Sequence, residues 1–281
     1  MSAPTTTAEG GFLDRYFELT KNGTTVRTEV LAGVTTFLAM AYIMALNPII
    51  LSDAGMDFGA VFAATALAAA IGSAIMGLWG KLPIAQAPGM GLNAFFAYTV
   101  VLGLGIPWET ALAGTFVSGI VFLLLAVTGL RRLVINAIPV PLKLAVGAGI
   151  GLFIAFIGLK EGGVIVNDDT VLVALGDLGS TKVQLALFGI VITAIMLARG
   201  IRGAVLYGIL GTTVVGVVVG FIAAPEAVVG SVPSLAPTFG VAFGALSDLL
   251  SLDLALVVFA MLFVDFFDTA GTLIAVTKQA D

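Results

Sequence analysis

The sequence predicts an all-α polytopic membrane protein with about eight transmembrane spans. Hydrophobic residues make up 59% of the chain and charged residues only 10%, and the mean hydropathy is +1.15. Soluble domains carry roughly 25% charged residues, so this composition indicates an integral membrane protein. The chain has no cysteine and no histidine. Disulfides, the usual zinc sites and imidazole proton relays are therefore excluded for these residues.

Apolar stretches of roughly 20 residues, the length that crosses a bilayer as a helix, recur along the whole chain. The first begins only at Val30, so we expect no cleavable signal sequence before it. The polar residues 225–253 are expected to be external or interfacial. The predicted spans are residues 30–51, 58–80, 84–102, 110–128, 139–159, 183–199, 203–224 and 254–277.

Basic residues support this division of the chain. If the N-terminus is cytoplasmic, ten of the twelve basic residues fall on the cytoplasmic side and only Lys160 and Lys182 fall outside. Such a bias follows the positive-inside rule. The ten are Arg15, Lys21, Arg27, Lys81, Arg131, Arg132, Lys143, Arg199, Arg202 and Lys278.

The third span is interrupted in its first half, where Pro88, Gly89 and Gly91 lie close together. Proline lacks a helix donor and glycine favours non-helical backbone. We expect residues 85–92 to be extended or looped at membrane depth, which is tolerated only where protein covers the backbone or a cavity is present. Asn93 would then cap a half-helix whose positive end points into that cavity, as in many transporter sites. A purely structural kink is the alternative interpretation.

The eighth span carries two carboxylates near its centre, Asp265 and Asp268. An aspartate at mid-bilayer costs about 2.5–3.5 kcal/mol on insertion scales, so a pair of them indicates function. Their i,i+3 spacing places both on one helical face. Small residues follow at 269–271, where a helix can loosen and expose backbone groups. This pattern predicts a site for a polar substrate or ion inside a transporter.

Several segments together resemble the AzgA-like adenine/guanine/hypoxanthine permeases, a branch of the nucleobase–cation symporter-2 (xanthine/uracil permease) superfamily. The resemblance runs from residue 12 to the C-terminus. It is carried by FLDRYF from Phe12, NGTTVRTEVLAGVTTFLAMAYI from Asn22, NPIILSDAGMD from Asn47, APGMGLNAFFAYTVV from Ala87, INAIPVPLKLAVGAGIGLFIAFIGLK from Ile135, PSLAPTF from Pro233 and FVDFFDTAGTL from Phe263.

This resemblance implies fourteen spans built as two inverted seven-span repeats, with spans three and ten as short strand–helix hybrids. The chain would supply the first repeat and the opening helix of the second, which suggests a truncated polypeptide. The implied divisions are an N-terminal cytoplasmic segment (1–29), core-domain spans one to four (30–128), gate-domain spans five to seven (129–224), an external or interfacial connection (225–253) and span eight (254–281).

The resemblance also implies the roles of individual residues. Asp265 would accept hydrogen bonds from a purine, Asn93 would bond the base edge, and the backbone at Gly89 and Gly91 would approach the ring. Asp268 would couple protonation to transport, because burial and a neighbouring like charge both favour a protonated carboxylate. The two aspartates could exchange these roles. No cofactor is expected beyond a coupling ion, with H+ expected over Na+.

The expected partners are a purine nucleobase and membrane lipid, without nucleic acid, and a homodimer is left open. The expected location is the cytoplasmic membrane. Three alternatives remain: an intramembrane aspartyl protease, an anion carrier of the same seven-plus-seven fold, and a non-transporting remnant. Two aspartates on one helix argue against the protease, which needs them on separate helices. An anion site would prefer a basic residue and half-helix N-termini.

Overall fold

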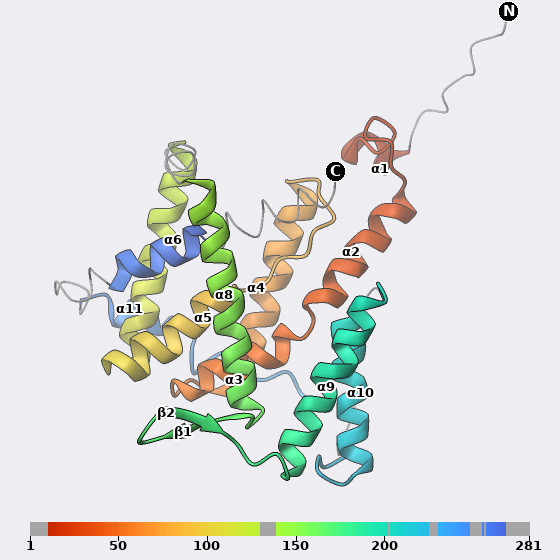
Figure 1. Ribbon diagram of the computed structural model, residues 1–281. Helices are drawn as coiled ribbons and strands as arrows, with labels where there is room; N and C mark the ends of the chain where they lie inside the picture. The colour runs from red at the N-terminus through yellow and green to blue at the C-terminus, as the bar shows by residue number, and fades with distance from the viewer. Residues whose placement is uncertain are drawn as a thin grey trace, which may run out of the picture.

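The computed structural model describes residues 11–129, 139–201, 203–224, 230–247, 255 and 257–267, and most of these are helical (Figure 1). The elements are α1 (Phe12–Phe17), α2 (Val26–Met40), α3 (Ile43–Asp53), α4 (Phe58–Leu78), α5 (Met90–Ala94), the π-helix η1 (Phe95–Gly103), α6 (Trp108–Val127), α8 (Val140–Glu161), β1 (Ile165–Asp168), β2 (Leu172–Leu175), α9 (Thr181–Ala198), α10 (Ala204–Val218), α11 (Val241–Gly244) and a helix at Val257–Phe267.

Among the described residues, four helical segments are long and apolar enough to cross a membrane: Val26–Asp53, Phe58–Leu78, Trp108–Val127 and Thr181–Ala198. Shorter apolar helices occupy Met90–Gly103, Ala204–Val218 and Val257–Phe267. With α8, these helices overlap all eight predicted ranges. The prediction of a helical membrane protein is therefore confirmed.

Local sequence explains where several helices begin. Thr25, Asp57 and Ser180 occupy the N-cap positions of α2, α4 and α9, and each side chain accepts a backbone N–H from the first turn. Pro107 and Pro139 stand immediately before α6 and α8. Their fixed φ suits a helix start, and the N–H that proline lacks would have no intrahelical partner there.

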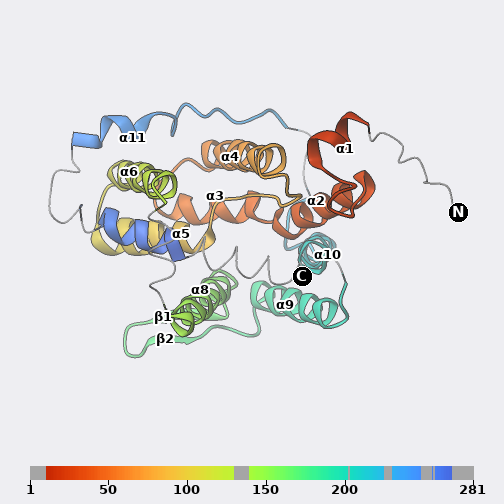
Figure 2. The ribbon, with the colours of Figure 1, turned by 90° about the horizontal axis from the view of Figure 1, so that it is seen from above.

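The helices form layers when seen from above (Figure 2). Helices α3 and α5 lie between α4 and α6 on one side and α8 on the other, while α9 and α10 form a pair that contacts α2. Among the described residues, a cluster of buried side chains lies where α3, α4, α5, η1, α6 and the Val257–Phe267 helix meet. Val100 and Met261 are completely buried there.

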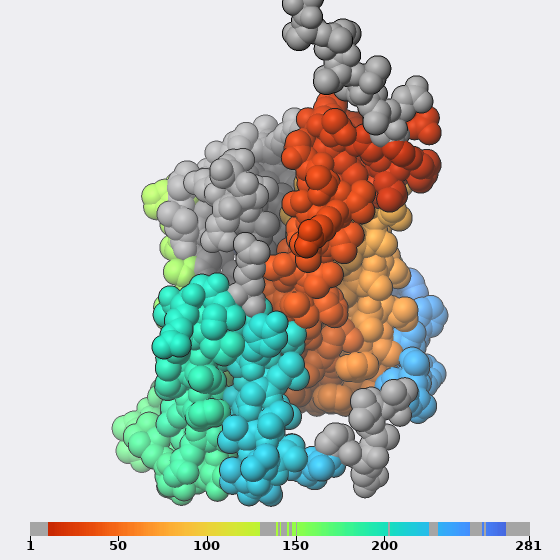
Figure 3. Space-filling view, turned by 90° about the vertical axis from the view of Figure 1, so that its right-hand side faces the viewer, coloured from red at the N-terminus to blue at the C-terminus, as the bar shows by residue number. Residues whose placement is uncertain are grey.

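The outward faces of the helices are apolar. Ile71 on α4, Leu123 on α6 and Val214 on α10 each expose about three fifths of their surface. Figure 3 shows α9 and α10 side by side next to the N-terminal helices on one such face. Exposed apolar surface of this extent is unfavourable in water but suits a lipid environment.

The first span is bent, because the chain leaves helical geometry at residues 41–42 between α2 and α3. Pro48 is buried inside α3 and lacks the N–H that would reach the carbonyl of Met44. Pro48 does not end the helix, since α3 continues to Asp53.

A two-stranded antiparallel hairpin, β1–β2, joins α8 to α9 and corrects the purely all-α prediction. Its strands have four residues each, too short for a clear pattern in the sequence. The Asp168 carboxylate accepts hydrogen bonds from the backbone N–H groups of Val171 and Thr170 in the turn. These bonds lower the pKa of Asp168 below its usual value.

Candidate functional site

The interruption of the third span is present in the structure. Residues 81–89 have no regular secondary structure, and α5 begins at Met90 with Gly89 as its N-cap. The predicted irregular backbone is thus confirmed up to Gly89, but the helix begins three residues before Asn93. The prediction that Asn93 caps the half-helix is wrong. Its backbone N–H instead donates to the Gly89 carbonyl at 3.2 Å, within the first turn.

Hydroxyl groups on the neighbouring helices bond the backbone of this extended segment. On α2, Thr36 Oγ1 accepts the N–H of Ala85 at 3.1 Å and lies 3.3 Å from the Pro83 carbonyl. On α4, Ser73 Oγ accepts the N–H of Gln86 at 2.8 Å and lies 3.3 Å from the Gln86 carbonyl. Protein groups therefore replace the helical partners that this backbone lacks, as irregular backbone at membrane depth requires.

The Asn93 side chain belongs to a chain of hydrogen bonds that links three helices. Asn93 Nδ2 donates to Asn47 Oδ1 on α3. Asn47 Nδ2 donates to Thr65 Oγ1 on α4 at 2.7 Å, and Thr65 Oγ1 donates to the Val61 carbonyl at 2.7 Å. Asn47 and Thr65 are 3% and 2% exposed, whereas Asn93 is half-buried.

Asn47 and Thr65 are site residues that the sequence analysis did not single out. A signal was present, because Asn47 is an amide within an apolar segment and its buried polar atoms need partners. Thr65 carried no comparable signal. A threonine in an apolar helix commonly bonds only the carbonyl of its own helix four residues earlier.

The predicted glycines lie beside Asn93. Gly89 is half-buried, and Gly91 is buried within α5. The helix then widens into η1, whose residues Phe96, Ala97 and Val100 pack into the core. A π-helix of this length is rare, and shorter π-bulges occur often at functional sites.

Asp265 lies on the Val257–Phe267 helix and is half-buried. It follows Val257 and Met261 at successive intervals of four residues, so the three share a helical face. Both apolar members of that face belong to the same core cluster as Met90 and Phe96. The structure thus brings the faces of the two predicted site helices to one core. Asp268 lies outside the described residues.

A cavity among the described residues lies away from this network. It has a volume of about 610 Å³ and lies between α1, the start of α2 and the end of α4, with Leu13, Val30 and Leu78 in its mainly apolar lining. None of the predicted site residues that the structure describes lines it. The polar network around Asn93 therefore remains the candidate site.

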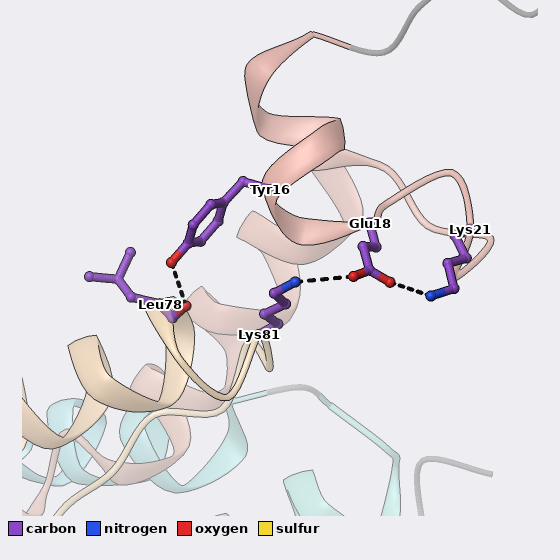
Figure 4. Close-up of polar contacts among 5 residues, drawn as sticks. All are labelled: Tyr16, Glu18, Lys21, Leu78 and Lys81. Atoms are coloured by element: carbon purple, nitrogen blue, oxygen red, sulfur yellow. Dashed lines mark hydrogen bonds and ion pairs between the residues drawn. The ribbon is translucent and has the colours of Figure 1, made fainter.

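The end of α4 near this cavity is tied to the N-terminal segment (Figure 4). Tyr16 Oη donates to the Leu78 carbonyl at 3.0 Å, and Glu18 accepts from Lys21 at 2.6 Å and from Lys81 at 3.2 Å. The hydrogen bonds and charges of Lys21 and then Lys81 lower the pKa of Glu18, and Glu18 raises the pKa of Lys21. This exposed group belongs to the surface of the molecule and not to the candidate site.

Comparison with known proteins identifies related sequences. The sequence profile of the Permease family matches residues 27–281. The chain is 50% identical over 274 residues to the guanine/hypoxanthine permease PbuG of Bacillus subtilis, covering 94% of this chain and 62% of that protein. It is 46% identical over 276 residues to the adenine permease AdeP of Escherichia coli, covering 98% of this chain and 61% of that protein. The chain therefore spans about three fifths of the length of these relatives.

Proposed function

Because the chain belongs to the Permease family, we propose that the protein takes part in secondary active transport of purine nucleobases across the cytoplasmic membrane, with H+ as the coupling ion. Similar proteins carry names that specify guanine, hypoxanthine or adenine. The observation that carries the proposal is the interrupted third span, where Asn93 presents a half-buried amide beside irregular backbone. Membership of this family also removes the aspartyl protease as an explanation of the two aspartates.

In this proposal the site is formed between α5 and the Val257–Phe267 helix. The Asp265 carboxylate accepts N–H groups of the purine, and Asn93 bonds the edge of the base. Gly89 and Gly91 let the ring approach the backbone, because neither has a side chain. Asp268 carries the coupled proton, as the second carboxylate of this apolar span, three residues after Asp265.

The proposed architecture has eight spans in this chain, the first seven forming one repeat of a seven-plus-seven inverted fold. Residues 30–128 form core-domain spans and residues 129–224 form gate-domain spans. Two features support this division: α9 and α10 pack chiefly on each other, and the main buried cluster lies among α3, α5, η1 and α6. The N-terminus is cytoplasmic, in accord with the bias of basic residues.

Substitution of the two aspartates tests the proposed mechanism in cells that express the protein. Asp265→Asn replaces a pure acceptor with a group that also donates, so it should raise the apparent Kd for hypoxanthine about tenfold or more, the loss of one charge-assisted hydrogen bond. Asp268→Asn mimics the protonated form. It should preserve binding better than uptake, and the remaining uptake should depend less on external pH.

Asp169→Asn is the control, because Asp169 is exposed in the β1–β2 turn and should not affect transport. The proposed mechanism is contradicted if both membrane variants bind and concentrate purine as the parent does. The substrate class is tested separately by competition with labelled hypoxanthine. Uracil or sulfate that competes better than adenine and guanine at equal concentration would overturn the purine assignment.

A further inference from the structure

The direction of the hydrogen-bond chain at the candidate site is determined by one backbone carbonyl. The Val61 carbonyl oxygen has no hydrogen, so the hydrogen in its 2.7 Å contact with Thr65 comes from the threonine hydroxyl. That hydroxyl has no second hydrogen to give. In its 2.7 Å contact with Asn47, Thr65 Oγ1 is therefore the acceptor, and the Asn47 NH2 group faces it.

The same reasoning extends to Asn93. Because the Asn47 NH2 group faces Thr65, its Oδ1 faces Asn93 and must accept a hydrogen bond there. Asn93 satisfies this oxygen with one hydrogen of its own NH2 group. The amide orientation of Asn93 thus follows from hydrogen counting along the chain.

Asn93 keeps two hydrogen-bonding groups beyond this chain, the oxygen Oδ1 and the second N–H of Nδ2. No further hydrogen bond of this side chain occurs among the described residues. Because the side chain is half-buried, these two groups are the ones that a ligand can meet. The reverse orientation would present two N–H donors and no acceptor.

We propose that Asn47 and Thr65 are positioning residues that fix Asn93 as a paired acceptor and donor, and so select purine edges that carry a donor beside an acceptor. This inference rests on the proposed function. Adenine has such an edge at its C6 amino group and a neighbouring ring nitrogen, and hypoxanthine has one at N1–H and O6. The N7/O6 edge of hypoxanthine carries two acceptors and would suit the reverse orientation.

If the hydrogen bonds of Asn47 and Thr65 only stabilise the protein, a different result is expected. Asn47 and Thr65 are buried, so removing their hydrogen bonds costs stability whether or not they position Asn93. A general loss of stability weakens the binding of adenine and of hypoxanthine to a similar extent. The ratio between the affinities for adenine and hypoxanthine changes only if the orientation of Asn93 changes.

The test compares three variants of Thr65 with the parent in cells that take up labelled hypoxanthine. Thr65→Val removes the acceptor for the Asn47 NH2 group, so Asn47 can turn this group toward Asn93 Oδ1. Asn93 then offers two donors, which match the N7/O6 edge of hypoxanthine and no C6 edge of adenine. The ratio of the inhibition constants of adenine and hypoxanthine should rise about tenfold or more.

Thr65→Ser keeps the hydroxyl and should retain the parental ratio. Thr65→Ala lacks the hydroxyl and suits a helix well, so it replaces Thr65→Val if that variant does not reach the membrane. An unchanged ratio in the variants without a hydroxyl, or a shift toward adenine, overturns the inference. If the parent takes up no purine, the proposed function has failed instead, so the two failures are distinguishable.

Discussion

Two adjacent threonines on α2 differ in what their hydroxyl groups contact. Thr35 Oγ1 donates only to the Leu31 carbonyl of its own helix, at 2.7 Å. Thr36 Oγ1 reaches the extended segment of the third span and accepts the N–H of Ala85. A buried N–H without an acceptor is costly, so Thr36 has a role that its neighbour lacks.

At this scale we predict that Thr36→Val lowers the free energy of unfolding by about 1–3 kcal/mol, because the Ala85 N–H loses its acceptor. Valine has nearly the same shape, so packing is preserved. The measurement is denaturant-induced unfolding of the purified protein in detergent. Thr35→Val is the matched control and should have little effect. Equal losses in both variants would show that the hydroxyl of Thr36 does not stabilise the extended segment.

At the scale of elements, α9 and α10 show how small residues permit close helix packing. A Cβ atom at Gly208 would collide with Thr193 Oγ1, and one at Gly189 would approach Thr212 Oγ1 to 2.7 Å. Each helix thus contributes a glycine opposite a threonine of the other. Such small residues allow close packing in membranes, where association depends on van der Waals contact and interhelical hydrogen bonds.

We predict that Gly208→Ala destabilises the α9–α10 pair by about 1–3 kcal/mol through overpacking. Gly211→Ala on the same helix is the control, because a Cβ there has open space around it. It should be neutral or stabilise the helix by up to about 1 kcal/mol, since alanine favours helix more than glycine does. Thermal unfolding in lipid nanodiscs measures both, and a stable Gly208→Ala variant would contradict the packing described.

The attachment of α1 to the end of α4 should depend on pH through Glu18. The pKa of Glu18 is lowered from its ordinary value of 4.5 by its bonds to Lys21 and Lys81. These ion pairs are therefore intact above pH 4.5 and are lost as the pH falls through the lowered pKa. The distribution of distances between spin labels at Gly11 and Trp79 should therefore broaden as the pH falls from 6 to 3. Glu18→Gln should give the broad distribution throughout. A narrow distribution in that variant would show that Glu18 does not hold the segment.

Within the whole molecule, α1 and the β1–β2 hairpin lie at opposite ends of the helical bundle (Figure 1). Lys81 pairs with Glu18 just after α1, and the hairpin carries Asp168 and Asp169. In the proposed orientation, the end with α1 and Lys81 faces the cytoplasm.

We therefore predict that cysteines introduced at Asp57 and Asp169 react with an impermeant thiol reagent added to intact cells. Cysteines at Lys81 and Arg199 should react only after the membrane is permeabilised. The chain has no natural cysteine that would interfere. Labelling of the opposite set would reverse the proposed orientation.

The membrane class, the positions of the helices and the interruption of the third span follow from the sequence alone. Hydropathy, proline and glycine act locally, so each can be read from neighbouring residues. The sequence also placed Asp265 among the candidate site residues, because charged groups within apolar spans are costly. Asn93 was predicted as the cap of the half-helix and, through the family resemblance, as a contact of the base edge. The role of Asp268 remains a prediction, since it lies outside the described residues.

Which polar groups contact one another depends on the tertiary structure. The contact of Asn93 with Asn47, and of Asn47 with Thr65, joins residues 46 and 18 positions apart. The hydroxyls of Thr36 and Ser73 are likewise brought to the extended segment by two other helices. No local pattern specifies such partners, because they depend on how α2, α3 and α4 pack around α5. The sequence therefore shows that these buried polar groups need hydrogen-bond partners, and the packing of the helices determines which partners they have.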